Sequence, residues 1–136
     1  MREFVFAQTA DLLRQLSKQL KQLKRAPRKL DADAIHDVRV AIRRLRECLR
    51  IFSKFYPGKE WKKVRRELGQ IMHACGDVRD RDIALGLLAE AGVPDDSKLV
   101  ARLRKERQAA DRHLLREVTR WKKSGCGREL KAQVEA

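Results

Sequence analysis

The chain has 136 residues, and its 33 Lys and Arg outnumber 19 Asp and Glu to give a formal net charge of +14. This length indicates one domain, and self-repulsion of that size favours an anionic partner such as nucleic acid, a membrane surface or a phosphate polymer. With only seven Gly and three Pro, the chain is neither collagen-like nor of low complexity. No apolar run reaches the roughly 20 residues that a membrane-spanning helix requires, and the N-terminus lacks the features of a secretory signal. We therefore expect a cytoplasmic protein.

The first part of the chain shows two helical patterns. Leucines spaced by three and four residues predict a helix over about residues 3–25, which Pro27 ends because the residue before a proline avoids the helical conformation. Asp31 or Asp33 can then cap a second helix, in which apolar residues step by three and four over residues 35–52. Both patterns predict helices that bury one face against the rest of the protein.

A third helical pattern follows the break at residues 56–58, which read Tyr-Pro-Gly. Gly76 is expected to interrupt this helix, because Asp77 and Asp80 after it resemble an N-terminal capping signal. Residues 78–91 are therefore predicted to form a separate short helix or a kinked continuation.

The last long helix is framed by two turns. Residues 92–94 end the preceding segment, and Asp95, Asp96 or Ser97 can cap the helix that follows. The two glycines within residues 124–127 predict its end.

No segment alternates convincingly with the period of a β-strand, so the sequence predicts an all-α fold. Short connections favour an antiparallel four-helix bundle, with a kink or break in the third helix near Gly76. Residues 1–124 are expected to form the bundle, and residues 125–136 form a C-terminal tail that could add a short helix.

The second helix carries its cations in one row beside its apolar face. At about 100° per residue the row occupies an arc of roughly 80° and extends over about 27 Å. Cations spaced three or four residues apart on a helix repel one another, and an ordinary solvated face avoids this by mixing charges of both signs. We therefore interpret the row as an anion-binding face. Its members are His36, Arg39, Arg43, Arg46, Arg50 and Lys54.

Two other charged patterns leave alternatives open. In residues 76–83 the signs alternate, so the acids either cap a helix start or hold Arg79 or Arg81 towards an anion. The last helix carries a second, more mixed basic face that includes Arg116 and Arg120, with His113 at its edge. Arg107 falls close to the apolar arc of this helix, either paired with an acid or pointing into a central groove.

The sequence contains no recognisable metal site or catalytic motif. The histidines are predicted on three different helices without the spacing of metal ligands, and phosphate-binding glycine loops are absent from the sequence. Three cysteines without a Cys-x-x-Cys pair are interpreted as reduced structural residues. We therefore expect no metal, no cofactor and no catalytic residue among these groups: His36, His73, His113, Cys48, Cys75 and Cys126.

Two segments resemble the CHAD family, the conserved histidine α-helical domain. Residues 36–46 match its opening pattern of His-x-x-Arg-Val-x-x-Arg-Arg-Leu-Arg, in which Arg44 is included. Residues 76–83 are similar to a later Leu-Gly-x-x-Arg-Asp-x-Asp-Val element, with Ile83 in the place of Val. Arg107 stands where such domains tend to carry an arginine. The resemblance extends over about residues 8–125.

The resemblance implies an all-helical protein that binds inorganic polyphosphate without catalysis, near enzymes of polyphosphate metabolism or on polyphosphate granules. Family members commonly have two helical bundles and about twice this length. Either a single bundle is therefore sufficient for binding or two chains pair to rebuild the two-bundle surface, and of these we expect a homodimer. The charge pattern and the resemblance together predict these polyphosphate-binding residues: His36, Arg39, Arg43, Arg44, Arg46, Arg50, Lys54, His73, Arg79, Arg107, His113, Arg116 and Arg120.

The alternative is a helical protein that binds the backbone of RNA or DNA. Reading of bases usually requires Asn, Gln or stacking aromatic side chains, and the cationic row of the second helix contains none. The excess of 20 arginines over 13 lysines suits phosphate recognition, because a guanidinium can donate to two phosphate oxygens at once.

Overall fold

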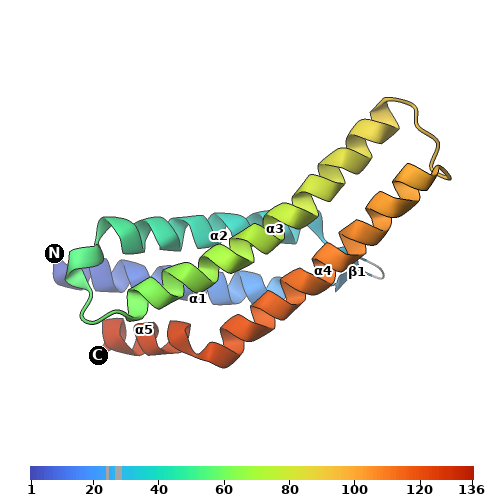
Figure 1. Cartoon of the computed structure of the whole chain (residues 1–136). Helices are drawn as coiled ribbons and strands as arrows, with labels where there is room; N and C mark the ends of the chain where they lie inside the picture. Colours follow the sequence, from blue (N-terminus) through green and yellow to red (C-terminus); the bar gives the residue numbers. More distant parts are fainter. Residues whose placement is uncertain (24, 27–28) are drawn as a thin grey trace.

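The computed structural model describes residues 1–23, 25–26 and 29–136 (Figure 1). The predicted all-α class is confirmed, and the described part of the chain adds one antiparallel pair of two-residue strands. The elements are α1 (Arg2–Gln22), β1 (Arg25–Ala26), β2 (Lys29–Leu30), α2 (Ala32–Ile51), the 3-10 helix η1 (Ser53–Phe55), α3 (Glu60–Glu90), α4 (Lys98–Ser124) and α5 (Cys126–Glu135).

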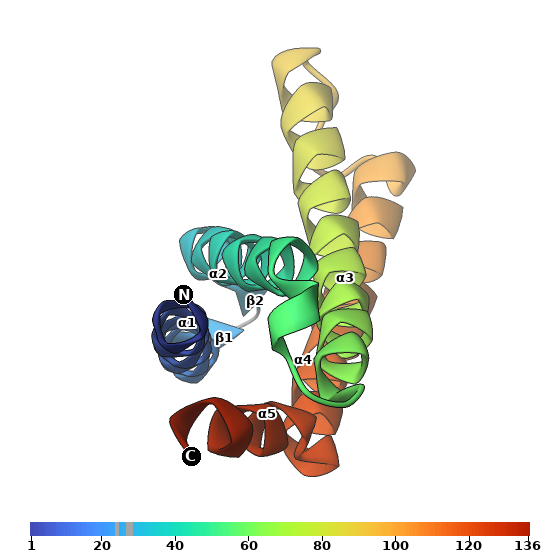
Figure 2. The same cartoon turned by 90° about the vertical axis from the view of Figure 1, so that its left-hand side faces the viewer.

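The helices form a bundle from which one helical hairpin projects. Viewed from the end, α1, α2, the first half of α3 and α5 surround the core (Figure 2). The second half of α3 and the first half of α4 extend beyond it as an antiparallel pair, which we call the arm (Figure 1). The arm exists because α3 has 31 residues and α2 only 20, so that α3 is longer by about 16 Å.

The fourth position of the bundle differs from the simple four-helix prediction. It is shared by the end of α4 and by α5, because Gly125 adopts a positive φ of 72° that turns the chain between them. The segment 125–136, expected as a tail, supplies Cys126, Leu130 and Val134 to the core. Burial of these side chains holds α5 against α1 and α3.

The predicted break at Gly76 is wrong. Helix α3 continues through this residue without interruption, and Asp77 and Asp80 lie inside it rather than at a helix start. Ala74, Cys75 and Val78 are fully buried around the glycine, so tertiary packing keeps the helix intact at a residue of low helix propensity.

The helix ends agree in part with the predicted signals. Asp31 caps α2 by accepting a hydrogen bond from the backbone N–H of Asp33, and Ser97 caps α4 by accepting one from Val100. Helix α1 ends at Gln22, a few residues earlier than predicted, and Pro27 lies outside the described residues.

Within the described residues, every helix is too short or too polar to cross a bilayer.

Gly76→Ala is expected to raise the free energy of unfolding by about 0.5–1 kcal/mol, because a methyl group there stabilises a helix interior. A Cβ atom at this position would meet nothing within 4 Å. Urea denaturation measures the change. Gly86→Ala in the arm part of α3 is the matched control, since a Cβ there also meets nothing within 4 Å. A loss of stability in Gly76→Ala alone would contradict a regular helix at this point.

Candidate anion-binding groove

Cationic side chains from α2 and α3 converge where the first half of α2 lies beside α3. A cavity of about 290 Å³ is lined by His36 and Arg39 of α2 and by Arg79 and Ile83 of α3. An adjoining cavity of about 200 Å³ has His36, Arg39 and Arg79 in common with the first and adds Arg43. Because the two cavities share these walls, we treat them as one feature, the α2–α3 groove.

The cationic row continues along α2 towards its C-terminal end. Arg46 lies across Gly69 of α3, where a Cβ atom would be only 3.3 Å from the Arg46 Nη2. Arg50 donates a 2.7 Å hydrogen bond to Glu47, which lowers the pKa of that carboxyl group. The positive charges of Arg65 and Arg46 lower this pKa further, so three guanidinium groups surround one exposed carboxylate.

Three of these arginines hold buried donor atoms without a protein acceptor. The Nε atoms of Arg39, Arg46 and Arg65 are inaccessible to solvent and have no hydrogen-bond partner in the described part of the chain. Buried donors are nearly always paired in folded proteins. Of the three, only Arg39 lines the cavities of the groove, where its guanidinium is a donor that the oxygens of an anion can meet.

The alternating segment of α3 divides its charges among different partners. Arg79 lines the groove, while Arg81 donates to the backbone oxygen of Asp77 in the same helix. Asp82 also lines the larger cavity of the groove, and its carboxylate accepts two hydrogen bonds from Arg107 of α4, at 2.9 and 3.2 Å. The interpretation of Asp80 and Asp82 as helix caps is therefore wrong, and only Arg79 of the two arginines lines a cavity of the groove.

Arg107 serves the fold. Its side chain is 6% exposed and is bound by Asp82, by the fully buried Asp111 and by the backbone oxygen of Leu30. Asp111 also accepts from the backbone N–H of Leu30 at 3.0 Å. The alternative in which Arg107 pairs with acids is thus confirmed, and the structure gives it no place in the groove. We call these groups the Arg107 cluster.

The cluster positions the groove. Leu30 directly precedes Asp31, the N-cap of α2, so fixing Leu30 to α4 fixes where α2 begins. His36 and Arg39 follow within the first two turns and lie opposite Arg79.

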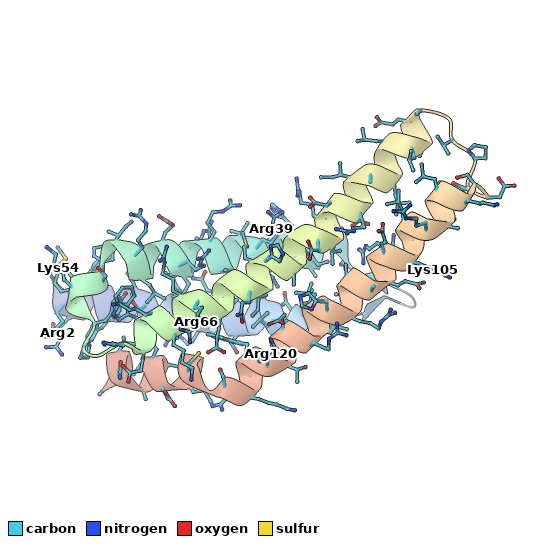
Figure 3. All side chains as sticks on the ribbon, in the orientation of Figure 1. Arg2, Arg39, Lys54, Arg66, Lys105 and Arg120 are labelled. Carbon is cyan, nitrogen blue, oxygen red and sulfur yellow. The ribbon has the colours of Figure 1, made fainter. Side chains whose placement is uncertain are left out.

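Other predicted residues lie apart from the groove. Arg44 is exposed and about 120° around α2 from the cationic row, and Lys54 lies beyond the end of α2 in η1. The side chain of His73 is 80% exposed on α3, with Nε2 3.9 Å from Asp77 Oδ2. The cations of α4 are separated from α2 by α3, as the labelled Arg39 and Arg120 show in Figure 3; they are His113, Arg116 and Arg120.

Arg65 was missed by the sequence analysis. Its signal is spacing: Arg65 and Arg79 are 14 residues apart, which returns to nearly the same side of a helix. The expected break at Gly76 concealed this relation, because it assigned the two arginines to different helices.

The cysteine thiols are unsuited to nucleophilic chemistry. All three are free and buried, and burial raises the pKa of Cys75 to about 12 and that of Cys126 to about 11. Cys126 also donates a 2.8 Å hydrogen bond to Glu67. A thiol with a raised pKa carries little thiolate at neutral pH. Among the residues described, no group of three or more His, Cys, Asp and Glu could hold a metal ion.

Comparison with known proteins gives one match. The family model of the CHAD domain matches residues 9–136, which include every residue of the groove. No curated protein and no solved structure matches the chain.

Arg107→Met is expected to lower the free energy of unfolding by about 3–5 kcal/mol, because it leaves the buried carboxylate of Asp111 without its guanidinium. Urea denaturation measures this loss. Arg104→Met removes an arginine of the same helix whose partner, Asp95, is 86% exposed, and it should cost less than about 1 kcal/mol. Equal effects of the two substitutions would contradict a structural role for the Arg107 cluster.

Proposed function

The chain belongs to the CHAD family, and from this premise we propose that it binds inorganic polyphosphate in the α2–α3 groove without catalysing a reaction. The family is associated with polyphosphate binding in general. The observation that carries the proposal is the convergence of His36, Arg39, Arg43 and Arg79 on shared cavities, beside buried arginine donors that lack a partner in the described chain.

The chemistry of the groove suits a chain of phosphates. From His36 to Arg50 the cationic row of α2 extends over about 21 Å, and polyphosphate offers oxygen acceptors along its whole length. Each guanidinium can donate two parallel hydrogen bonds to one phosphate group. Neutralising the phosphates also releases counterions, and this release strengthens binding. Its contribution to the affinity decreases as the salt concentration increases.

His36 adds an adjustable donor at one end of the groove. A neutral imidazole donates one N–H, and a protonated imidazole donates two and carries a charge. His36 lies beside Arg39 and Arg79 on the cavity wall, where its N–H can reach the same phosphate as these arginines. Its role in the proposal is that of a binding residue.

The proposal assigns the protein no reaction of its own. With Mg²⁺ or Mn²⁺ present, we expect no release of phosphate from polyphosphate, and steady turnover would overturn this part of the proposal. Association with enzymes of polyphosphate metabolism, and residence in the cytoplasm or on polyphosphate granules, belong to the same proposal.

Nucleic acid is the rival ligand, and a direct comparison tests it. Polyphosphate should bind more tightly than single-stranded RNA with the same number of phosphates, because the groove is lined by arginines and has no Phe, Tyr or Trp among its described lining residues on which bases could stack. Titrations of both polymers at two salt concentrations measure the affinities. Equal affinities at both concentrations would indicate a general polyanion binder instead.

The same titration locates the site. Arg43→Glu with Arg50→Glu is expected to weaken polyphosphate binding by at least about 100-fold, since two charge-assisted contacts become repulsive. The control, Lys105→Glu with Arg112→Glu, makes the same change of net charge on exposed residues of α4. Circular dichroism checks that both variants remain helical. A larger loss in the α4 variant would place the ligand outside the groove.

We also propose that two copies of the chain associate through the arm. Leu87 is exposed on α3, one turn after Ile83, which is also exposed and lines the groove beside the start of α2. The arm, residues 76–111, holds eight carboxylates against seven Lys and Arg and is nearly neutral, whereas the whole chain is strongly cationic. The arm is therefore where two copies can meet with least repulsion, and a two-fold contact would be closed.

Leu87→Glu is expected to raise the dimer dissociation constant by at least about 10-fold, because it places a charge in an apolar contact. Sedimentation velocity across a concentration series measures it. Phe4→Glu is the matched control, since Phe4 and Leu87 are each 60% exposed but Phe4 lies on α1. A chain that stays monomeric throughout the series would refute the dimer.

A further inference from the structure

A second cationic cavity lies between α1 and the junction of α4 with α5. Its volume is about 870 Å³, and it has no residue in common with the α2–α3 groove. No carboxylate is among its lining residues in the described part of the chain. Its cationic side chains are Arg14, Lys18, Lys21, Lys122, Arg128 and Lys131.

Four of these cations are available to a ligand. Arg14 is engaged by Glu135 at 2.8 Å, and Arg128 donates to the backbone oxygen of Lys122 at 2.8 Å. The four lysine ammonium groups make no ion pair with any described residue. They come from both walls, two from α1 and one each from α4 and α5, so a ligand between the walls meets positive charge on either side.

The floor of the cavity is apolar. Leu13 and Leu16 of α1 belong to the core and line it from one side, and the half-buried indole of Trp121 lines it from the other. The indole lies directly against Gly127, where a Cβ atom would be only 2.6 Å from the ring, so only glycine leaves room for it. Polyphosphate has no apolar part, so this floor serves no purpose for it.

We propose that this cavity binds a nucleoside triphosphate, with the base on the apolar floor beside Trp121 and the phosphates on the lysines of α1, α4 and α5. The cavity volume is within the range of about 300–1,000 Å³ for small-molecule sites. Stacking on an indole stabilises the binding of any of the nucleobases, because each of them has a flat aromatic face. The hydroxyl of Ser17 and the amide of Gln22 also line the cavity and can form hydrogen bonds to the base or ribose.

The test uses ATP, tripolyphosphate and adenosine as probes. The chain contains two tryptophans, so the change Trp61→Phe leaves Trp121 as the only reporter of the cavity. ATP should change its fluorescence saturably and bind at least about 10-fold more tightly than tripolyphosphate, because only ATP occupies both floor and lysines. Calorimetry on the unmodified chain repeats the comparison independently of the indole.

Two variants separate this cavity from the groove. Lys18→Ser with Lys122→Ser should weaken ATP binding by at least about 10-fold and change polyphosphate affinity in the groove by less than about 3-fold. The groove variant, Arg43→Glu with Arg50→Glu, should do the reverse. Circular dichroism confirms the fold of each.

Three results would overturn the proposal. They are equal affinities for ATP and tripolyphosphate, an absence of saturable ATP binding, and loss of ATP binding in the groove variant alone. Adenosine should bind weakly in every case, because it lacks the phosphates that the lysines require; adenosine binding as tight as that of ATP would also refute it. Tripolyphosphate is itself a short polyphosphate and would also bind the proposed groove site, so the calorimetric comparison is repeated in the groove variant Arg43→Glu with Arg50→Glu. With this step, a failure of the cavity proposal is distinguished from a failure of polyphosphate binding in the groove.

Discussion

The Arg107 cluster is the constraint on which the rest of the structure depends. In a low-dielectric interior, the charges of Arg107 and Asp111 are tolerated only while each compensates the other. Because the same groups bind Asp82 of α3 and the backbone of Leu30, one interaction fixes three elements at the point where the arm leaves the bundle. Arg107 is therefore not available to a ligand, and its role is to fix the positions of the helices that carry the other arginines.

The sequence was informative wherever local spacing decides the outcome. The row from His36 to Arg50 and the caps Asp31 and Ser97 could be predicted, because each depends on residues a few positions apart. Arg107 was stated only as alternatives: Asp111 lies four residues away, within the reach of sequence spacing, but Asp82 lies 25 residues away and Leu30 lies 77 away. Gly76 misled because helix propensity is a weak term that the burial of its neighbours overrides.

The net charge of +14 proves to be divided among faces that differ in character. Along α2 and α3 the cations are mostly arginines with partly buried guanidinium groups, whereas the α1–α5 side offers lysines above an apolar floor. Arginine favours fixed, bidentate contacts and lysine a mobile point charge. The two faces are therefore suited to different anions, and a single overall measure of basicity would not distinguish them.

The continuity of α3 has a mechanical consequence. One stiff helix carries Arg79 at the groove and, 11 residues later, Glu90 at the tip of the arm. Over these 11 residues the helix rises about 16 Å, and Asp82, which Arg107 binds, lies between its two ends. The groove and the tip of the arm are therefore parts of one rigid element, whose position is set where Arg107 holds it.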